Sequence, residues 1–437
     1  MPNKLPSLDI DLLEPLASKN LNEPNIYGYS IESWLAAVES LGPAFSATLG
    51  DQECVVIASD EANKQAWRTP DDWAYRATDA GTFFRRQMGE DHVSALDAEP
   101  HRRLRKLILP AFGAASMQRE IQSAANIFDE GFRGYSGKPI DLFQAFCRIF
   151  TSALSHTQIK TVITEDLIGK LCQFEEEFIN GQQLSLEDQE IWFSRESYQS
   201  LKKEAFAYFD SAVAEHRAGD HPGDSLGLLI NRSPPEGFDK LSESELAEAA
   251  YLLSVAGVGN IANILCPALF AIQETEWINR LRVEFANFQP EKLSGMKSFP
   301  ITKAIISESE RFFAPAPVIP KRTTQDLDFL GTFIPSGTLI MHLHTLSHFE
   351  KTRYSNPFLF DPGRWLNQDL VKANAFGGGK HMCLGMGVTR IYLPLALAIL
   401  VPNYDIKLPE PPSATYIDPE FTPSPMTTRM IGNLQQR

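Results

Sequence analysis

The sequence predicts a mainly α-helical fold with small β-sheets, built as one large domain. The chain has 437 residues, of which 43% are hydrophobic and 22% charged, a balance typical of a globular protein. Residues 100–312 carry mainly helical patterns, whereas short strand-like segments lie near the two ends of the chain. No internal repeat is visible and the candidate linkers are short, so we expect one domain rather than the two or three that length alone suggests.

The first expected elements follow an N-terminal extension of residues 1–28. Residues 29–41 are expected to form a helix, and residues 45–58 alternate like a β-hairpin around Gly50. Ser59 comes next and is expected to cap a second helix, because serine is a preferred N-cap residue.

One long apolar helix is expected in the middle of the chain. Ser242 is followed three residues later by Glu245, the capping-box pattern, and an apolar periodicity then continues to about residue 273. Pro267 lies inside this stretch, where its missing N–H predicts a kink or a lost backbone hydrogen bond.

After Pro315 the pattern changes to short strands. Strand-like segments occupy residues 318–319, 329–334 and 338–341, and a final helix is expected from about Leu384.

Charge and cysteine content exclude several classes of protein. The net charge of -15 argues against a protein that binds nucleic acid or anionic membranes in general. The N-terminus lacks the basic and apolar regions of a signal peptide, and the apolar run at residues 393–401 is shorter than the ~18 residues of a membrane span. We therefore expect a cytoplasmic protein without a membrane anchor. No disulfide framework or zinc site is expected, because the cysteines are odd in number and scattered: Cys54, Cys147, Cys172, Cys266 and Cys383.

The most distinctive segment is a glycine loop that ends in a cysteine. Residues 376–385 read F-G-G-G-K-H-M-C-L-G, and the glycines permit backbone conformations closed to other residues. Cys383 comes just before a helical pattern, where the helix dipole favours a thiolate. Gly385 leaves room for a flat ligand to approach the backbone, and His381 could reach an acidic group on that ligand.

The spacing F-G-x-G-x-H-x-C-x-G resembles the haem-binding loop of the cytochrome P-450 family. This resemblance implies a single haem-thiolate domain over residues 1–437, in which haem b lies between the long central helix and the cysteine loop. It implies that Cys383 ligates the iron and that Phe376, His381 and Gly385 belong to the cofactor site. Thiolate ligation favours O–O cleavage. The usual activity is insertion of one atom of dioxygen into an apolar substrate, with electrons from a redox partner.

Two further sets of residues resemble family features. Glu308 and Arg311 match the family's E-x-x-R pair, which together with the arginine at the position of Arg364 braces the haem loop. Donors to the haem propionates are implied upstream of the cysteine. His101 and Arg105 share one helix face, and Arg322 follows the E-x-x-R arginine by eleven residues; together with His381 they supply donors for both carboxylates.

The long helix departs from the family at its most reactive segment. Residues 256–260 read A-G-V-G-N, where the family usually has A-G-x-[D/E]-T. Gly257 fits and gives space above the iron, but Gly259 replaces the acid and Asn260 replaces the alcohol of the pair that relays protons to dioxygen.

Three functions remain open after this departure. In the first, Asn260 substitutes for the alcohol by donating a hydrogen bond, and monooxygenation survives. In the second, the protein is a peroxide-dependent or electron-independent haem-thiolate enzyme, such as a peroxygenase, isomerase or dehydratase. In the third, it is a non-catalytic haem-binding sensor, and Asn260 could in any case be a helix residue without a chemical role.

The substrate and the electron donor are specified only by class. We expect a hydrophobic small molecule such as a lipid, terpenoid or other secondary metabolite, covered by a lid of residues 166–218. The resemblance places these apolar residues at the pocket: Phe83, Phe84, Met88, Val318, Phe421 and Met426. No reductase segment is recognisable, so we expect a separate ferredoxin or flavodoxin with its reductase. An acidic partner of this kind would suit the basic residues on the cysteine side: Arg102, Arg103, Lys106 and Lys380.

Overall fold

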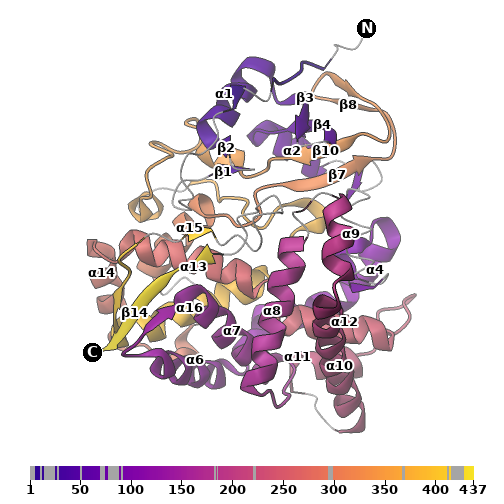
Figure 1. The fold of residues 1–437 in the computed structure, drawn as a ribbon. Coiled ribbons are helices and arrows are strands. Elements are labelled where there is room, and N and C mark those ends of the chain that lie inside the picture. The colour runs from indigo at the N-terminus through magenta and orange to yellow at the C-terminus, as the bar shows by residue number, and fades with distance from the viewer. Residues whose placement is uncertain are drawn as a thin grey trace. The chain divides into compact units, whose positions relative to one another are not determined.

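The computed structural model contains two compact units (Figure 1). The first comprises Met1–Arg102 and Ser307–Cys383, and the second comprises Arg103–Ile306 and Leu384–Arg437. The prediction of a single domain stays a prediction. The structure describes residues 5–9, 12–13, 25–26, 29–49, 52–68, 74–76, 88–89, 92–181, 184, 186–219, 223–293, 299–366, 370–410, 413–414 and 428–437.

The first unit is organised around a five-stranded sheet. Strand β4 pairs antiparallel with β3 and parallel with β10, and β10 continues antiparallel through β7 to β5. Two small antiparallel pairs, β1–β2 and β8–β9, lie outside it. The strands are β1 (Asn25–Ile26), β2 (Tyr29–Ser30), β3 (Ala44–Leu49), β4 (Gln52–Ile57), β5 (Ala74–Arg76), β7 (Ile319–Thr323), β8 (Leu327–Phe329), β9 (Thr332–Ile334) and β10 (Leu339–His342).

Two predicted helices of the first unit are confirmed, together with the cap that was predicted for the second. Helix α1 (Ile31–Leu41) begins after Ser30, whose hydroxyl accepts a hydrogen bond from Ser33 N. Helix α2 (Asp60–Arg68) begins after Ser59, whose hydroxyl accepts from Ala62 N at 3.0 Å. The predicted hairpin is also present as β3 and β4.

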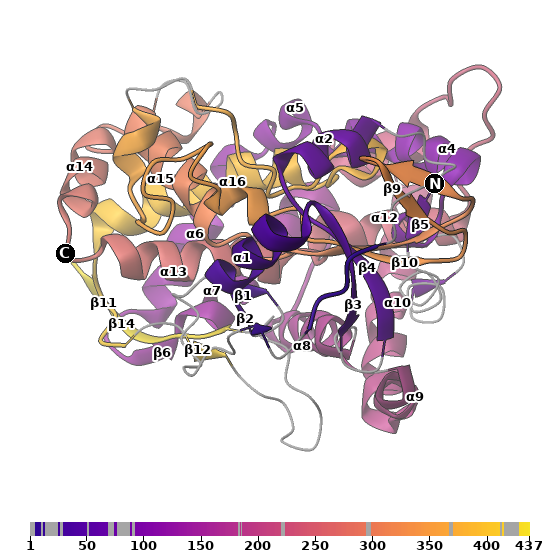
Figure 2. The ribbon, with the colours of Figure 1, turned by 90° about the horizontal axis from the view of Figure 1, so that it is seen from above.

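The second unit is mostly helical. Helix α7 is buried along most of its length and packs against α6, α8, α12 and α13. Strands β11, β14 and β6 form an antiparallel sheet (Figure 2), and β12 pairs with β13. The helices are α5 (Ala114–Gln118), α6 (Ile121–Tyr135), α7 (Leu142–Gln158), α8 (Glu165–Gly181), α9 (Leu186–Ser194), α10 (Glu196–Ala218), α11 (Ser225–Asn231), α12 (Glu243–Ser254), α13 (Val258–Ile272), α14 (Glu276–Glu284) and α16 (Met386–Asn403). The strands are β6 (Pro139–Asp141), β11 (Tyr404–Lys407), β12 (Ser413–Ala414), β13 (Thr428–Arg429) and β14 (Ile431–Gln436).

Helices α4 (Ala98–Ile108) and α15 (Pro300–Phe312) contain residues of both units. The described 3-10 turns are η3 (Val93–Ala95), η4 (Leu109–Phe112), η5 (Pro290–Lys292), η7 (Leu346–Phe349), η8 (Pro362–Trp365) and η9 (Gly379–His381).

The long central helix differs from its prediction. It starts at the predicted capping box, where Glu245 N donates to the Ser242 hydroxyl, but it is interrupted between α12 and α13. The interruption is caused by Gly257, whose φ of +83° is a left-handed conformation that ends regular helix. Pro267 lies inside α13, which continues through it, so the predicted kink or lost backbone hydrogen bond at this residue stays a prediction.

The predicted strand at residues 329–334 is divided by a turn at residues 330–331, so that it belongs to two strands. Leu330 and Gly331 both have positive φ, and they connect β8 to β9 as a short hairpin. The predicted final helix is confirmed as α16 and starts at Met386, two residues later than expected.

Two helical stretches in the described part of the chain are long and apolar enough to cross a membrane by length and composition. They are Glu243–Ile272 and Met386–Asn403, so the expectation that apolar stretches are too short is wrong by this measure. Most of each stretch, 61% and 67% respectively, is buried within the fold, as in the core helix of a globular protein. The absence of a membrane anchor stays a prediction.

Candidate active site

The cysteine loop of the first unit folds back on itself. Gly377 and Gly379 have φ values of +69° and +65°, which only glycine adopts without strain. A side chain at Gly378 would come within 2.3 Å of the indole of Trp67, so this position also requires glycine. The loop is closed by a 3.0 Å hydrogen bond from Cys383 N to Phe376 O, which presents the thiol at the end of the turn.

Cys383 differs from the other cysteines in its exposure. Its residue is exposed, whereas the other four cysteines are buried. Burial raises the pKa of the Cys54 thiol to about 12 and that of Cys172 to about 11, and it raises the pKa of Cys147 and Cys266 well above the usual value. A thiolate is the form that binds a metal, so the four buried thiols are poor candidates.

Two of the predicted propionate donors lie against each other. The imidazole rings of His101 and His381 are stacked, with centroids 3.8 Å apart and an angle of 19° between planes. His101 is buried on α4, and His381 in η9 lies 3.6 Å from the carboxylate of Asp97. These two histidines are 280 positions apart in the sequence, but their rings are in contact in the folded chain.

The two predicted arginines are positioned separately. Arg322 lies on β7, partly buried, and donates to Gly337 O at 2.8 Å. Arg105 lies one helical turn after His101 on α4 and is also partly buried. Their predicted role toward a propionate stays a prediction.

The predicted brace is confirmed and is fully buried. Arg311 donates to Glu308 through Nε at 2.8 Å and Nη2 at 2.7 Å, and both side chains are 0% exposed. Arg364 in η8 donates to the same carboxylate at 3.1 Å. Backbone carbonyls accept the remaining Arg311 bonds, at His348, Pro357 and Leu359.

His348 links this brace to the cysteine loop and was not predicted. Its Nδ1 lies 2.9 Å from Arg311 O, and Asn374 N donates to its Nε2 at 3.0 Å. Asn374 O in turn accepts from Gly377 N at 2.9 Å, at the start of the glycine turn. Burial lowers the pKa of His348 to about 3, so the ring is neutral and can accept at Nε2. No local sequence pattern marks this residue.

The segment with the unusual sequence lies at the start of α13. Asn260 is in its first turn and lines a small hollow in the second unit. The hollow is lined from three helices, by Phe143, Gln144, Cys147, Cys172, Glu175, Glu176, Ile179, Val258, Gly259, Asn260 and Asn263. Glu175 is the residue here that sequence reasoning missed, because it lies on α8, far from the segment in sequence.

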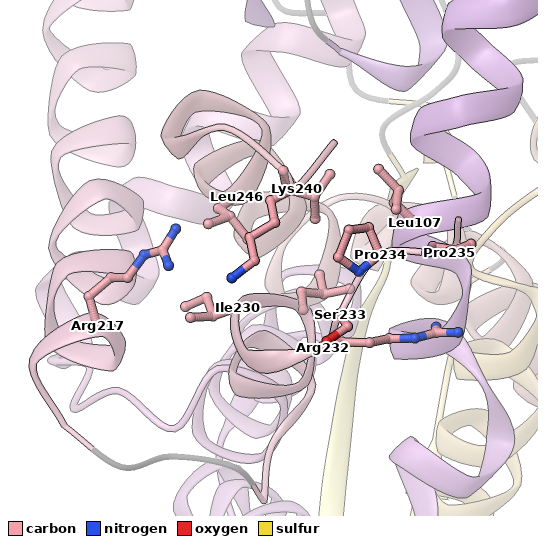
Figure 3. Close-up of a pocket in the computed structure, with 11 residues that line it drawn as sticks. Leu107, Arg217, Ile230, Arg232, Ser233, Pro234, Pro235, Lys240 and Leu246 are labelled. Atoms are coloured by element: carbon pink, nitrogen blue, oxygen red, sulfur yellow. The ribbon is translucent and has the colours of Figure 1, made fainter. Parts of the chain in front are cut away.

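A second hollow of the second unit contains none of the predicted site residues (Figure 3). Its walls are mainly aliphatic and proline side chains, with three cationic groups. Arg217 and Lys240 point toward one another across it, whereas Arg232 points away. Because Arg217 already pairs with Glu243 at 2.8 Å, we assign this hollow no role.

The predicted substrate residues fall only partly within the described chain. Met88 is buried and Val318 is partly buried, whereas Phe83, Phe84, Phe421 and Met426 lie outside the described residues. The predicted lid, residues 166–218, contains most of α8 and all of α9 and α10.

Comparison with known proteins decides the family. The family described as "Cytochrome P450" matches residues 33–425, which is most of the chain. The chain belongs to the cytochrome P450 family. The match includes the cysteine loop, the brace and the interrupted helix, so the motif resemblance and the mainly α-helical fold with small sheets are confirmed.

Two curated relatives of this P450 are distant in sequence but cover most of the chain. Pentalenene oxygenase of Streptomyces avermitilis is 25% identical, over 70% of this chain and 72% of its own. Cyclooctat-9-en-7-ol 5-monooxygenase of Streptomyces melanosporofaciens is 22% identical, over 82% and 83%. Among solved structures, the retinoic acid bound cyanobacterial CYP120A1 has a TM-score of 0.78 at 18% identity and covers 100% of both chains, which shows the same fold.

Membership of the P450 family establishes the cofactor and the class of reaction. P450 enzymes bind haem b, and the family and its named relatives support monooxygenase activity in general, which in this family uses dioxygen, a hydrophobic substrate and a redox partner. The residues of the first unit fit such a cofactor, since an exposed thiol suits iron, and imidazole and guanidinium groups suit acidic side groups. When bound, the haem supplies the redox chemistry that activates dioxygen.

Proposed function

We propose that this P450 inserts one oxygen atom into a terpenoid, lipid or other hydrophobic secondary metabolite, with Cys383 as the iron ligand. The exposure of Cys383 at the end of a closed glycine turn carries the proposal, since the other four thiols are buried and protonated. Two relatives are named for the oxidation of pentalenene and of cyclooctat-9-en-7-ol, which supports a terpenoid substrate.

The proposed substrate contacts are apolar, as this class of substrate requires. Met88 and Val318 are the described members of the predicted pocket, and the helices α8, α9 and α10 are proposed to form its lid. Turnover of a panel of apolar substrates, with ferredoxin or flavodoxin plus reductase in one arm and peroxide alone in the other, tests the proposal. Product in the electron-donor arm supports it, and product only with peroxide supports the alternative below.

We propose that a separate ferredoxin or flavodoxin supplies the electrons and docks on basic residues. We narrow the predicted basic set to its more exposed members. Arg103 pairs at 2.5 Å with Glu245, whose side chain is 9% exposed, so it stabilises the start of α12. Arg102 is 48% exposed but pairs with Glu99, whereas Lys106 and Lys380 are exposed. These three residues are the proposed docking groups of a cytoplasmic enzyme without a membrane anchor.

The haem propionates are proposed to bind His101, Arg105, Arg322 and His381. A hydrogen bond to a charged group contributes about 1.5–3 kcal/mol, so Arg105→Ala and Arg322→Ala should each speed haem release by one to two orders of magnitude. The double variant should lose haem faster than either. Transfer of haem to an excess of apomyoglobin measures the rate, and Arg133→Ala, on an exposed helix surface, is the control. Unchanged release in the double variant would contradict the assignment.

A second function is favoured by the absence of an acid at Gly259. A peroxide-dependent or electron-independent enzyme, such as a peroxygenase, isomerase or dehydratase, does not need a proton relay to dioxygen. In the monooxygenase that we propose, Gly257 would leave space for the bound cofactor, and the Asn260 amide could donate a hydrogen bond to dioxygen.

Asn260→Ala distinguishes these two functions. The variant should fold and keep its carbon monoxide spectrum, because Asn260 is partly exposed in the first turn of α13. If the protein is a monooxygenase, product per reducing equivalent should fall by roughly 10-fold, as expected for loss of one hydrogen bond of about 1.5 kcal/mol, and peroxide release should rise. If no electron donor is consumed by either protein, the second function holds. Unchanged rate and coupling would show that Asn260 has no chemical role.

A further inference from the structure

A buried carboxyl group lies at the interruption of the central helix. Glu175 on α8 is 5% exposed, and its Oε1 accepts a hydrogen bond from Gly257 N at 3.0 Å. Its other oxygen accepts a short hydrogen bond from the hydroxyl of Tyr251 on α12. The carboxyl group thus binds both sides of the break, at the last turns of α12 and at the N-cap of α13.

The break supplies groups that favour a carboxylate at this place. A helix N-terminus leaves its first N–H groups without partners inside the helix, and its dipole favours negative charge. Burial acts in the opposite direction and favours the neutral acid. Burial is the larger effect and raises the pKa of Glu175 to about 7, against the hydrogen bonds from Tyr251 and Gly257 that lower it. Glu175 therefore exchanges its proton near neutral pH.

The groups around Glu175 do not titrate in this range, with one exception. The pKa values of Tyr251 on α12, Tyr198 on α10, and Cys147 and Cys172 on α7 and α8 are all raised, chiefly by burial, so these groups stay neutral near pH 7. Glu176 is the exception. Its pKa is also raised by burial, and Gln144 Nε2 donates to it at 2.9 Å.

Glu175 and Asn260 line the same hollow, and the space at Gly259 is open. Both residues border the small hollow between α7, α8 and α13, whose surface is mainly apolar but which has room for water beside its carboxyl and amide groups. A Cβ at Gly259 would meet no atom closer than Phe143 Cζ at 3.8 Å, an ordinary contact. Helix α13 has no acidic side chain at Gly259, but the carboxyl group of Glu175 on α8 borders the same hollow.

We propose that Glu175 is the proton donor of this enzyme and passes protons through water in the hollow, past Asn260, to dioxygen. The inference rests on the proposed monooxygenase function. Each turnover consumes one dioxygen, two electrons from the redox partner and two protons, and it forms one hydroxylated product and one water. The O–H bond of the Glu175 carboxyl breaks when it gives up a proton, and solvent returns that proton, so the residue is regenerated.

Glu175→Gln separates proton donation from a purely structural role. Glutamine can still accept from Gly257 N and donate to the oxygen of Tyr251, so the helix start, the melting temperature and the carbon monoxide spectrum should be unchanged. Product formation should slow by about 10²-fold, the low end of what a positioned proton donor contributes, and peroxide release should rise. A merely structural Glu175 would leave both unchanged, because glutamine keeps the cap.

Two further variants test the chemistry of the group. Tyr251→Phe removes a hydrogen bond that favours the carboxylate, so the pKa of Glu175 should rise and activity should persist to higher pH, since the protonated acid is the donor. Gly259→Asp in the Glu175→Gln background should restore product formation at least 10-fold, because the space at residue 259 accepts a side chain.

Infrared titration gives a readout that does not depend on turnover. The wild type should show a carboxylic acid band that is lost with a midpoint near pH 7, and Glu175→Gln should lack it. If Glu176→Gln removes this band and Glu175→Gln does not, the assignment is overturned. If the wild type shows the carboxylic acid band but forms no product with any electron donor, the monooxygenase proposal is contradicted, whereas the titration of Glu175 is not. An active wild type whose Glu175→Gln variant keeps its rate, coupling and pH profile overturns the inference.

Discussion

Replacing Cys383 with alanine should abolish the strongly red-shifted absorption band that reduced haem-thiolate proteins show with carbon monoxide. The band requires sulfur as iron ligand, and Cys383 is the exposed cysteine, whereas Cys54, Cys147, Cys172 and Cys266 are buried. The loop itself should survive, because its closing bond runs from the backbone of residue 383 to Phe376 O. The measurement is a carbon monoxide difference spectrum of the reduced protein.

The control for this experiment is a buried cysteine. Cys54→Ala lies on β4 in the core of the same unit and should keep the band at full intensity relative to haem content. Product formation should be lost only in the Cys383 variant. If Cys383→Ala retains the band, another residue ligates the iron and the proposed site is wrong.

Glu308→Ala should destabilise the protein by about 3–5 kcal/mol, because it leaves the buried guanidinium of Arg311 without its counter-charge. It also removes the acceptor of Arg364 Nε and of Trp365 Nε1. The expected result is poorly folded protein with little bound haem, since His348 connects Arg311 to the base of the cysteine loop. Chemical denaturation and the haem-to-protein ratio measure the effect.

A surface ion pair provides the matched comparison for Glu308. Asp129 pairs with Arg133 one helical turn away, with side chains 36% and 59% exposed, so Asp129→Ala should cost no more than about 1 kcal/mol. If the Glu308 and Asp129 variants are equally stable and equally loaded with haem, the brace is a minor contact.

Features that depend on neighbouring residues were predictable from the sequence. The capping box of α12, the hairpin of β3 and β4 and the glycine turn before Cys383 are set within about a dozen residues, and the structure has all three. The Glu308–Arg311 pair was also predictable, because residues three apart share a helix face.

The helix interruption could not be predicted because its causes are not local. The sequence favoured a kink at Pro267, the residue with a recognised local effect. The structure breaks the helix at Gly257, whose free N–H finds its acceptor in Glu175, 82 positions earlier. His348 and Trp67 escaped prediction for the same reason, since each contacts the cysteine loop from a distant segment.

The brace also restricts how this chain can change during evolution. The Glu308 carboxylate accepts five hydrogen bonds, two from Arg311 and one each from Asp361 N, Arg364 and Trp365. A substitution at any one of these side chains leaves the others with unmatched charge or unpaired donors in a buried place. We therefore expect single substitutions in this group to be selected against, so that its members are retained together.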